Sequence, residues 1–298
     1  MLFYIGGDCI LRYLRFLIKC SRRHLNYFSS PTLEQAKLLA ENNLSFLAGV
    51  HYMNAKEYAQ ASSCFKQAKA YKHLVVSYAK QGFYGKALDL ADEKGFYELG
   101  AKIASHIQDF RQAAYFYSFF EPSHAAKLYR DLSCYYEAGY CYLVQYDALN
   151  AIDMFRRCRD KVKRTQGLKE VSDYALVLYL TKDYATAFRI FIALDDFYSA
   201  LECAKKLKEN ELVRSCKLLI GYQEASNQHY HFAAQCLESL APDKALCFYA
   251  KAGDYEAQVR LLLETGDYEK AIQVCMLHQN LNKAYEIASI YNPQLLTS

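Results

Sequence analysis

The feature that most constrains this chain is a short repeat, in which an aromatic residue is followed three positions later by a small one. The aromatic residues from Tyr58 to Phe110 recur at every thirteenth position, and near copies of the unit return as GDYEAQ and GDYEKA close to the C-terminus. The spacing is lost between Ala151 and Ala187. The positions that carry the repeat are Tyr58, Ala61, Tyr71, Tyr84, Ala87, Tyr97, Gly100, Phe110, Ala113, Tyr184, Ala187, Phe197, Ala200, Tyr255, Tyr268 and Ala271.

A unit of this length suits a helix of about ten residues, about 15 Å long, and a turn of about three. An aromatic and a small residue three apart share one helix face. We expect the ring to fill the space between neighbouring helices and the small residue to let the adjacent backbone approach. Because helices this short are unstable alone in water, they must stack. The repeat predicts an all-α solenoid, an α-α superhelix of about ten to twelve short antiparallel hairpins or half-hairpins.

Glycine and proline mark the expected helix ends. Gly253 and Gly266 should end helices, and the Asp that follows each should cap the next helix. Pro122 and Pro242 fit the first turn of a helix. We expect a basic N-terminal segment at residues 1–29, a first solenoid arm at 30–160 and a second at 161–298. A basic loop after Arg159 should join the arms, with a longer helix from about Leu168 and further long helices between Asn210 and His231.

The repeat strings KEYAQA, GFYGKA, GFYELG and QDFRQA resemble the degenerate tetratricopeptide-like and clathrin-heavy-chain-like α-solenoids of trafficking and ciliary transport proteins. They are also similar to helical regions beside helicase-like modules. The resemblance covers roughly residues 32–291. It implies a non-enzymatic scaffold or adaptor that binds a protein or peptide partner. The alternative is a helical accessory region, or a fragment, of a larger helicase-like or trafficking protein.

The charge is unevenly distributed. The net charge is +4, yet residues 1–28 and 156–164 are both strongly basic, so the remainder is mildly acidic, which disfavours nucleic-acid binding along the whole chain. The second basic stretch is a candidate partner-docking patch for an acidic protein segment. A solvated loop and a salt-dependent phosphate contact are its alternatives. Its basic residues are Arg156, Arg157, Arg159, Lys161, Lys163 and Arg164.

No phosphate-loop, dinucleotide, zinc-protease, esterase or calcium-loop motif occurs, so we expect no catalytic residue, cofactor or metal. His229 and His231 stand two apart, which is a poor spacing for a shared metal on a helix. The eleven cysteines form no CxxC pair, which favours free thiols in the cytoplasm. Cys64, Cys203 and Cys236 follow the repeat and should be buried.

The cysteine pair Cys134 and Cys141 should also lie in the core, since their spacing corresponds to two helical turns.

Residues 10–23 have an amphipathic helical pattern. Tyr13, Leu14 and Leu17 fall on the apolar face, and Arg12 and Arg15 fall on the opposite face. Docking on the first hairpin, peripheral membrane contact, and the end of an upstream domain all fit this pattern. No stretch is long and apolar enough for a transmembrane helix.

Overall fold

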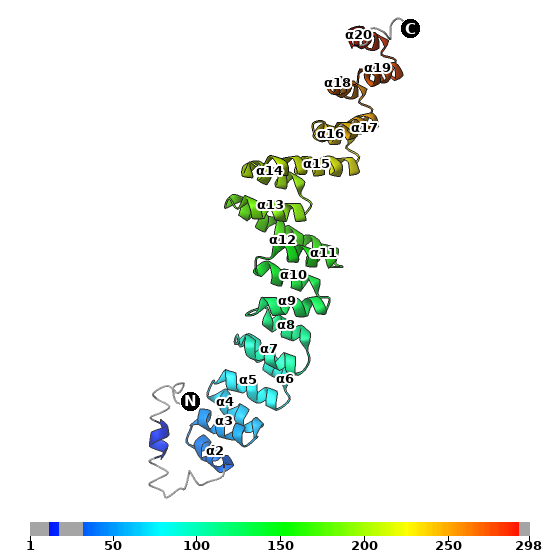
Figure 1. Ribbon diagram of the computed structural model, residues 1–298. Helices are drawn as coiled ribbons and strands as arrows, with labels where there is room; N and C mark the ends of the chain where they lie inside the picture. Colours follow the sequence, from blue (N-terminus) through cyan, green and yellow to red (C-terminus); the bar gives the residue numbers. More distant parts are fainter. Residues whose placement is uncertain (1–11, 18–31, 292–298) are drawn as a thin grey trace. The chain divides into compact units, whose positions relative to one another are not determined.

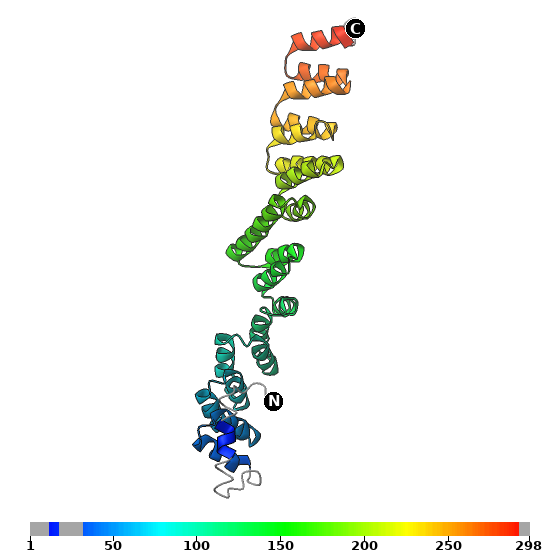
Figure 2. The same ribbon diagram turned by 90° about the vertical axis from the view of Figure 1, so that its left-hand side faces the viewer.

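The structure, a computed structural model, describes residues 12–17 and 32–291. In that part of the chain every regular element is an α-helix, and successive helices pack against each other within each compact unit (Figures 1 and 2). The predicted all-α solenoid is confirmed. The chain divides into two compact units, residues 1–159 and 160–298. The assignment of residues 30–160 and 161–298 to separate arms stays a prediction.

Unit 1 begins with a short helix at residues 12–17 and continues through helices of eight to ten residues, joined by short connections. These are α2 (Thr32–Glu41), α3 (Ser45–Asn54), α4 (Tyr58–Gln67), α5 (Tyr71–Lys80), α6 (Tyr84–Glu93), α7 (Tyr97–His106), α8 (Phe110–Tyr117), α9 (Pro122–Asp131), α10 (Tyr135–Val144) and α11 (Ala148–Arg157).

Unit 2 contains helices of 8 to 20 residues. The 17-residue α15 confirms the long helix expected near Asn210. The helices are α12 (Lys161–Leu180), α13 (Tyr184–Ala193), α14 (Phe197–Leu207), α15 (Asn210–Ser226), α16 (Tyr230–Leu237), α17 (Pro242–Ala252), α18 (Tyr255–Thr265), α19 (Tyr268–Leu277) and α20 (Leu281–Tyr291).

The predicted basic loop after Arg159 is wrong. The long helix α12 begins at Lys161, well before Leu168, so half of the basic run lies in its first turn. Asp160 caps this helix, because its carboxylate accepts hydrogen bonds from the amides of Val162 at 2.9 Å and Lys163 at 3.2 Å. Cations in a first turn oppose the helix dipole, which is why the stretch resembled a loop in sequence.

One type of short turn joins most of the helices, with two residues between the helices at Lys208, Gly253 and Gly266 and three elsewhere. A residue in a left-handed conformation always stands two positions before the next helix begins. The amide of the residue that follows it donates to a carbonyl in the last turn of the preceding helix, as from Glu57 to Tyr52 at 2.9 Å. This bond satisfies a carbonyl that the helix end leaves free. The left-handed positions are Asn43, Lys56, Lys69, Gly82, Gly95, Gln108, Ser133, Tyr146, Lys182, Asp195, Lys208, Gln228, Gly253, Gly266 and Gln279.

The predicted caps are confirmed in part. Gly253 and Gly266 end their helices with φ of 73° and 81°. Asp254 accepts a hydrogen bond from the amide of Ala257 at 3.0 Å. Asp267 makes no such cap bond, and its carboxylate pairs instead with Lys270 at 2.7 Å.

Two connections within the units have a different form. Pro122 and Pro242 occupy the first turns of α9 and α17, as predicted. The helices that precede them, α8 and α16, are only eight residues long. In place of the left-handed turn, the amide of Glu121 donates to the carbonyl of Tyr117, and the amide of Ala241 donates to that of Leu237.

The core is a series of buried clusters along each stack, and the small repeat residues lie inside them. Ala61, Ala87 and Ala113 are fully buried. At Gly100 the close neighbour is a ring and not the adjacent backbone that the sequence led us to expect, because a β-carbon built there would lie 2.5 Å from Phe116. The same relation, with a partner in the last turn of the next helix, joins Gly49 to Phe65, Gly139 to Phe155 and Gly221 to Leu237.

The repeat aromatics begin their helices, and Tyr71, Tyr84 and Tyr97 lie half-buried against the core clusters. Tyr97 stacks on Phe119 at 4.1 Å between ring centroids, and Tyr268 stacks on Tyr291 at 4.2 Å. Each partner lies at or just after the end of the next helix, because the start of one antiparallel helix lies beside the end of the following one. Phe110 is 48% exposed, so its ring does not fill an interhelical space.

The short helix at residues 12–17 packs on the first hairpin (Figure 1). Phe16 is buried, Tyr13 and Leu17 pack partly against the same cluster, and Leu14, expected on the apolar face, is exposed. This agrees with the docking interpretation. Residues 10, 11 and 18–23 lie outside the described residues. None of the described helices has the length and apolar character needed to cross a membrane.

Alanine substitutions at three glycines of unit 1 distinguish the effect of side-chain packing on stability from that of backbone conformation. Gly100→Ala should destabilise the chain by about 1–3 kcal/mol, because its methyl group meets Phe116. Gly82→Ala should cost about 1 kcal/mol or more, because Gly82 is left-handed with φ of 81° although nothing lies near it. Gly85→Ala, in open space at the start of α6, should be neutral or stabilising by up to about 1 kcal/mol. Urea unfolding followed by circular dichroism measures all three, and equal effects would contradict this assignment.

Candidate functional site

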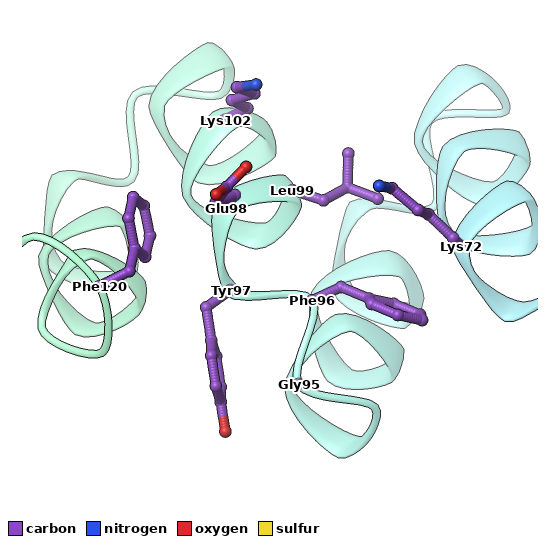
Figure 3. A pocket seen from close by; sticks show the side chains of 8 residues that line it. All are labelled: Lys72, Gly95, Phe96, Tyr97, Glu98, Leu99, Lys102 and Phe120. Atoms are coloured by element: carbon purple, nitrogen blue, oxygen red, sulfur yellow. The ribbon is translucent and has the colours of Figure 1, made fainter.

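A surface hollow of unit 1 lies at the start of α7 and has a volume of about 400 Å³. Helix α7 and the turn before it supply most of its lining, and α5 and the α8–α9 connection supply one residue each (Figure 3). Phe120 stands on one side of Glu98, and Leu99 and Lys72 stand on the other. The lining residues are Lys72, Gly95, Phe96, Tyr97, Glu98, Leu99, Lys102 and Phe120.

The local sequence explains why this helix start is open. Gly95 takes the left-handed position of the turn, and Phe96 then stands at the N-cap, where its side chain cannot accept a hydrogen bond. The positive end of the helix dipole is therefore uncapped by any side chain beside the hollow. Glu98, in the first turn, has the charge that this end favours.

A network of aromatic rings fixes one wall. The ring of Tyr97 is nearly parallel to that of Phe119, which meets Tyr115 edge-on at 5.1 Å between centroids. The Tyr115 hydroxyl donates to Asp92 at 3.0 Å. Burial and this hydrogen bond raise the pKa of Tyr115, so it keeps its proton at neutral pH. Stacked and edge-on aromatic pairs stabilise a fold by more than the burial of their apolar surface alone would give.

The charges beside the hollow do not balance. Lys72 and Lys102 are exposed, and neither has an ion-pair partner within the part of the chain that the structure describes. Glu98 is also exposed and contributes one negative charge. By contrast, nearby Lys94 pairs with Glu93 at 2.7 Å and lies over the Tyr71 ring. The hollow therefore joins apolar walls to a rim with an excess of positive charge.

The predicted docking patch does not form one described surface, because its residues fall in both units. Arg156, Arg157 and Arg159 belong to unit 1, where Arg157 pairs with Asp153 at 2.9 Å. Lys161, Lys163 and Arg164 belong to the first turn of α12 in unit 2. Its role in partner docking stays a prediction.

The histidines considered as metal ligands bind carboxylates. The Nδ1 atom of His229 lies 2.7 Å from Glu224, and that of His231 lies 2.8 Å from Asp254. Among the described residues, no three potential metal-ligating side chains gather at one point.

Cysteines mostly behave as small core residues. Cys64, Cys141 and Cys203 are buried, while Cys134 and Cys236 are half-buried. Burial raises the pKa of Cys141 and that of Cys203 to about 11, so both remain thiols at neutral pH.

Most residues of the hollow were missed from the sequence. Tyr97 was identified only as a repeat position. The available signal was the doubling of aromatic residues at Phe96-Tyr97 and Phe119-Phe120, where most repeat units have one. The sequence did not reveal that Phe96, Tyr97 and Phe120 line a common hollow, with Phe119 stacked on Tyr97.

Comparison of the sequence with models of known protein families and with curated proteins finds no match in either case.

A carboxylate in unit 2 makes the stability pH-dependent. Hydrogen bonds from Tyr198 at 2.7 Å and from His229 hold the pKa of Glu224 below its ordinary value of 4.5. The folded chain gains stability from this shift above the ordinary pKa, and the gain is lost as pH falls through the lowered pKa. Tyr198→Phe should therefore reduce Tm at pH 7 by more than it does near pH 3.

The matched control for this prediction is Tyr222→Phe. Tyr222 is exposed on α15, and its hydroxyl makes no described hydrogen bond. The melting temperature of the Tyr222→Phe variant should equal that of the unsubstituted chain at both pH values. A Tyr198→Phe deficit that stays the same, or grows, at acid pH would contradict the role given to Glu224.

Proposed function

We propose that this chain is a non-enzymatic protein-interaction scaffold, and that the hollow at the start of α7 holds a segment of its partner. The observation that carries this proposal is the open hollow itself. It combines apolar side chains, a fixed aromatic wall and exposed lysines. Aromatic anchors in partly desolvated pockets with polar rims are typical of sites that dominate protein binding.

The solenoid architecture supports the same proposal. A stack of short helices gives an extended surface in which each repeat contacts only its neighbours. Exposed side chains can therefore vary without disturbing the core. We also propose a cytoplasmic, reducing environment, which is supported by the free thiols of nine described cysteines.

Affinity purification of the tagged full-length chain, followed by quantitative mass spectrometry, tests the scaffold proposal. The variant Phe120→Ala removes an exposed ring from the hollow. Phe232→Ala removes a comparably exposed ring from α16 in unit 2. Phe120→Ala should reduce recovery of at least one reproducible protein partner about tenfold, since a ring that anchors an interface contributes about 1–2 kcal/mol or more.

Phe232→Ala should leave that partner unchanged. Circular dichroism melts establish that both variants are folded. If both variants recover the same partners as the unsubstituted chain, then the hollow is not the partner-binding site and the proposal for it is wrong.

A further inference from the structure

The charges and shape of the hollow indicate what it binds. We propose that its occupant is a short acidic peptide segment that inserts an aromatic or large aliphatic side chain between flanking Asp or Glu residues. This inference rests on the proposed function and specifies the partner for the same site.

The apolar part of the hollow requires an anchor. Leu99 and Phe96 are half-buried, and Phe120 is 41% exposed on the opposite side, so water now contacts apolar surface from two sides (Figure 3). A volume of about 400 Å³ falls in the lower part of the range of small ligand pockets. It suits one or two large side chains and is too small for a folded element. Burial of such a side chain in the hollow removes its apolar surface from water and favours binding.

The two lysines favour a peptide that has acidic residues on both sides of its anchor. Lys72 comes from α5 and Lys102 from the second turn of α7, so they approach the hollow from different helices. A segment with acidic residues before and after its anchor can reach both. Complementary charges at the rim of a site raise the rate of association and select the partner more than they raise affinity.

Glu98 distinguishes a peptide from a nucleic acid. Its carboxylate lies between Phe120 and Leu99 and would repel the phosphate that every nucleotide carries, whereas a peptide can place uncharged residues beside Glu98 and its acidic residues beside the lysines (Figure 3). Peptide amides are hydrogen-bond donors and can satisfy this carboxylate. Base stacking needs free aromatic faces, and one face of Tyr97 is already covered by Phe119. These observations favour an acidic peptide over single-stranded RNA.

Fluorescence anisotropy with the full-length chain tests this inference. The labelled probes are an acidic peptide with a central Phe-Leu pair, the same peptide with Ser-Ser in place of the pair, a peptide with Lys in place of the acidic residues, and a uridine-rich single-stranded RNA. The first peptide should bind about tenfold or more tightly than each of the others. Its affinity should fall as salt rises from about 50 to about 300 mM.

The double variant Lys72→Glu/Lys102→Glu should weaken binding of the acidic peptide about tenfold or more, and binding of the Lys peptide should increase. The control, Lys127→Glu/Lys206→Glu, makes the same charge change at exposed lysines outside the lining of the hollow and should leave both affinities unchanged. The inference is overturned if the Lys peptide or the RNA binds the unsubstituted chain most tightly, or if the Ser-Ser peptide binds as well as the Phe-Leu peptide. Equal effects of the two double variants would also overturn it.

The two proposals can fail separately. If Phe120→Ala loses a cellular partner and the acidic peptide does not bind, the hollow is a protein-binding site but its ligand is not acidic. If Phe120→Ala keeps every partner, the proposed function of the hollow is wrong whatever the peptides do.

Discussion

The hydrogen bond that closes each short left-handed turn is the constraint on which the other features depend. An amide donates back into the last turn of the preceding helix, and the residue before the next N-cap is held in the left-handed region. The turn reverses the chain within two or three residues. The helices around the turn range from 8 to 20 residues, but because the turn recurs, the same side-chain contacts recur from one hairpin to another. A helix-start ring meets the end of the next helix, and a core glycine meets a large side chain in the last turn of the next helix.

Where the left-handed turn is replaced by a proline connection, the connection presents aromatic or charged side chains. At Pro122 the preceding helix stops after eight residues, and Phe119 and Phe120 fall in the connection, where one ring stacks on Tyr97 and the other borders the hollow. At Pro242 the corresponding connection holds Glu238, which accepts hydrogen bonds from Tyr249 and Arg260. Burial acts to raise the pKa of Glu238, but these two partners lower it overall. In both units a break in the repeat presents side chains that a regular turn would not.

The repeat could be predicted from the sequence because it rests on residue types with strong local preferences. A small residue three positions after most of the repeat aromatics, and a proline at a first turn, each have a limited set of structural meanings. The turns were harder to recognise, because lysine or glutamine occupies many of the left-handed positions and glycine only a few, as at Lys56 and Gln108. The start of α12 was missed since its first turn contains three cations, and the cap that outweighs them is a single carboxylate, Asp160. The hollow could not be predicted at all, because Lys72 and Phe120 are distant in the sequence and meet only through the stacking of intervening helices.

The packing of α7 on α8 connects the core to the surface of unit 1. Gly100 directly follows Leu99, so one helix turn contributes both a wall of the hollow and the contact with Phe116. Phe116 is on α8, shortly before Phe120, which forms the opposite wall. The distance between the two walls is therefore set by how closely the Phe116 ring approaches Gly100. Since each repeat of a solenoid contacts mainly its neighbours, a change at this contact should alter the hollow while leaving distant helices as they are. The absence of a side chain at Gly100 thus bears on both the packing of this hairpin and the width of the hollow.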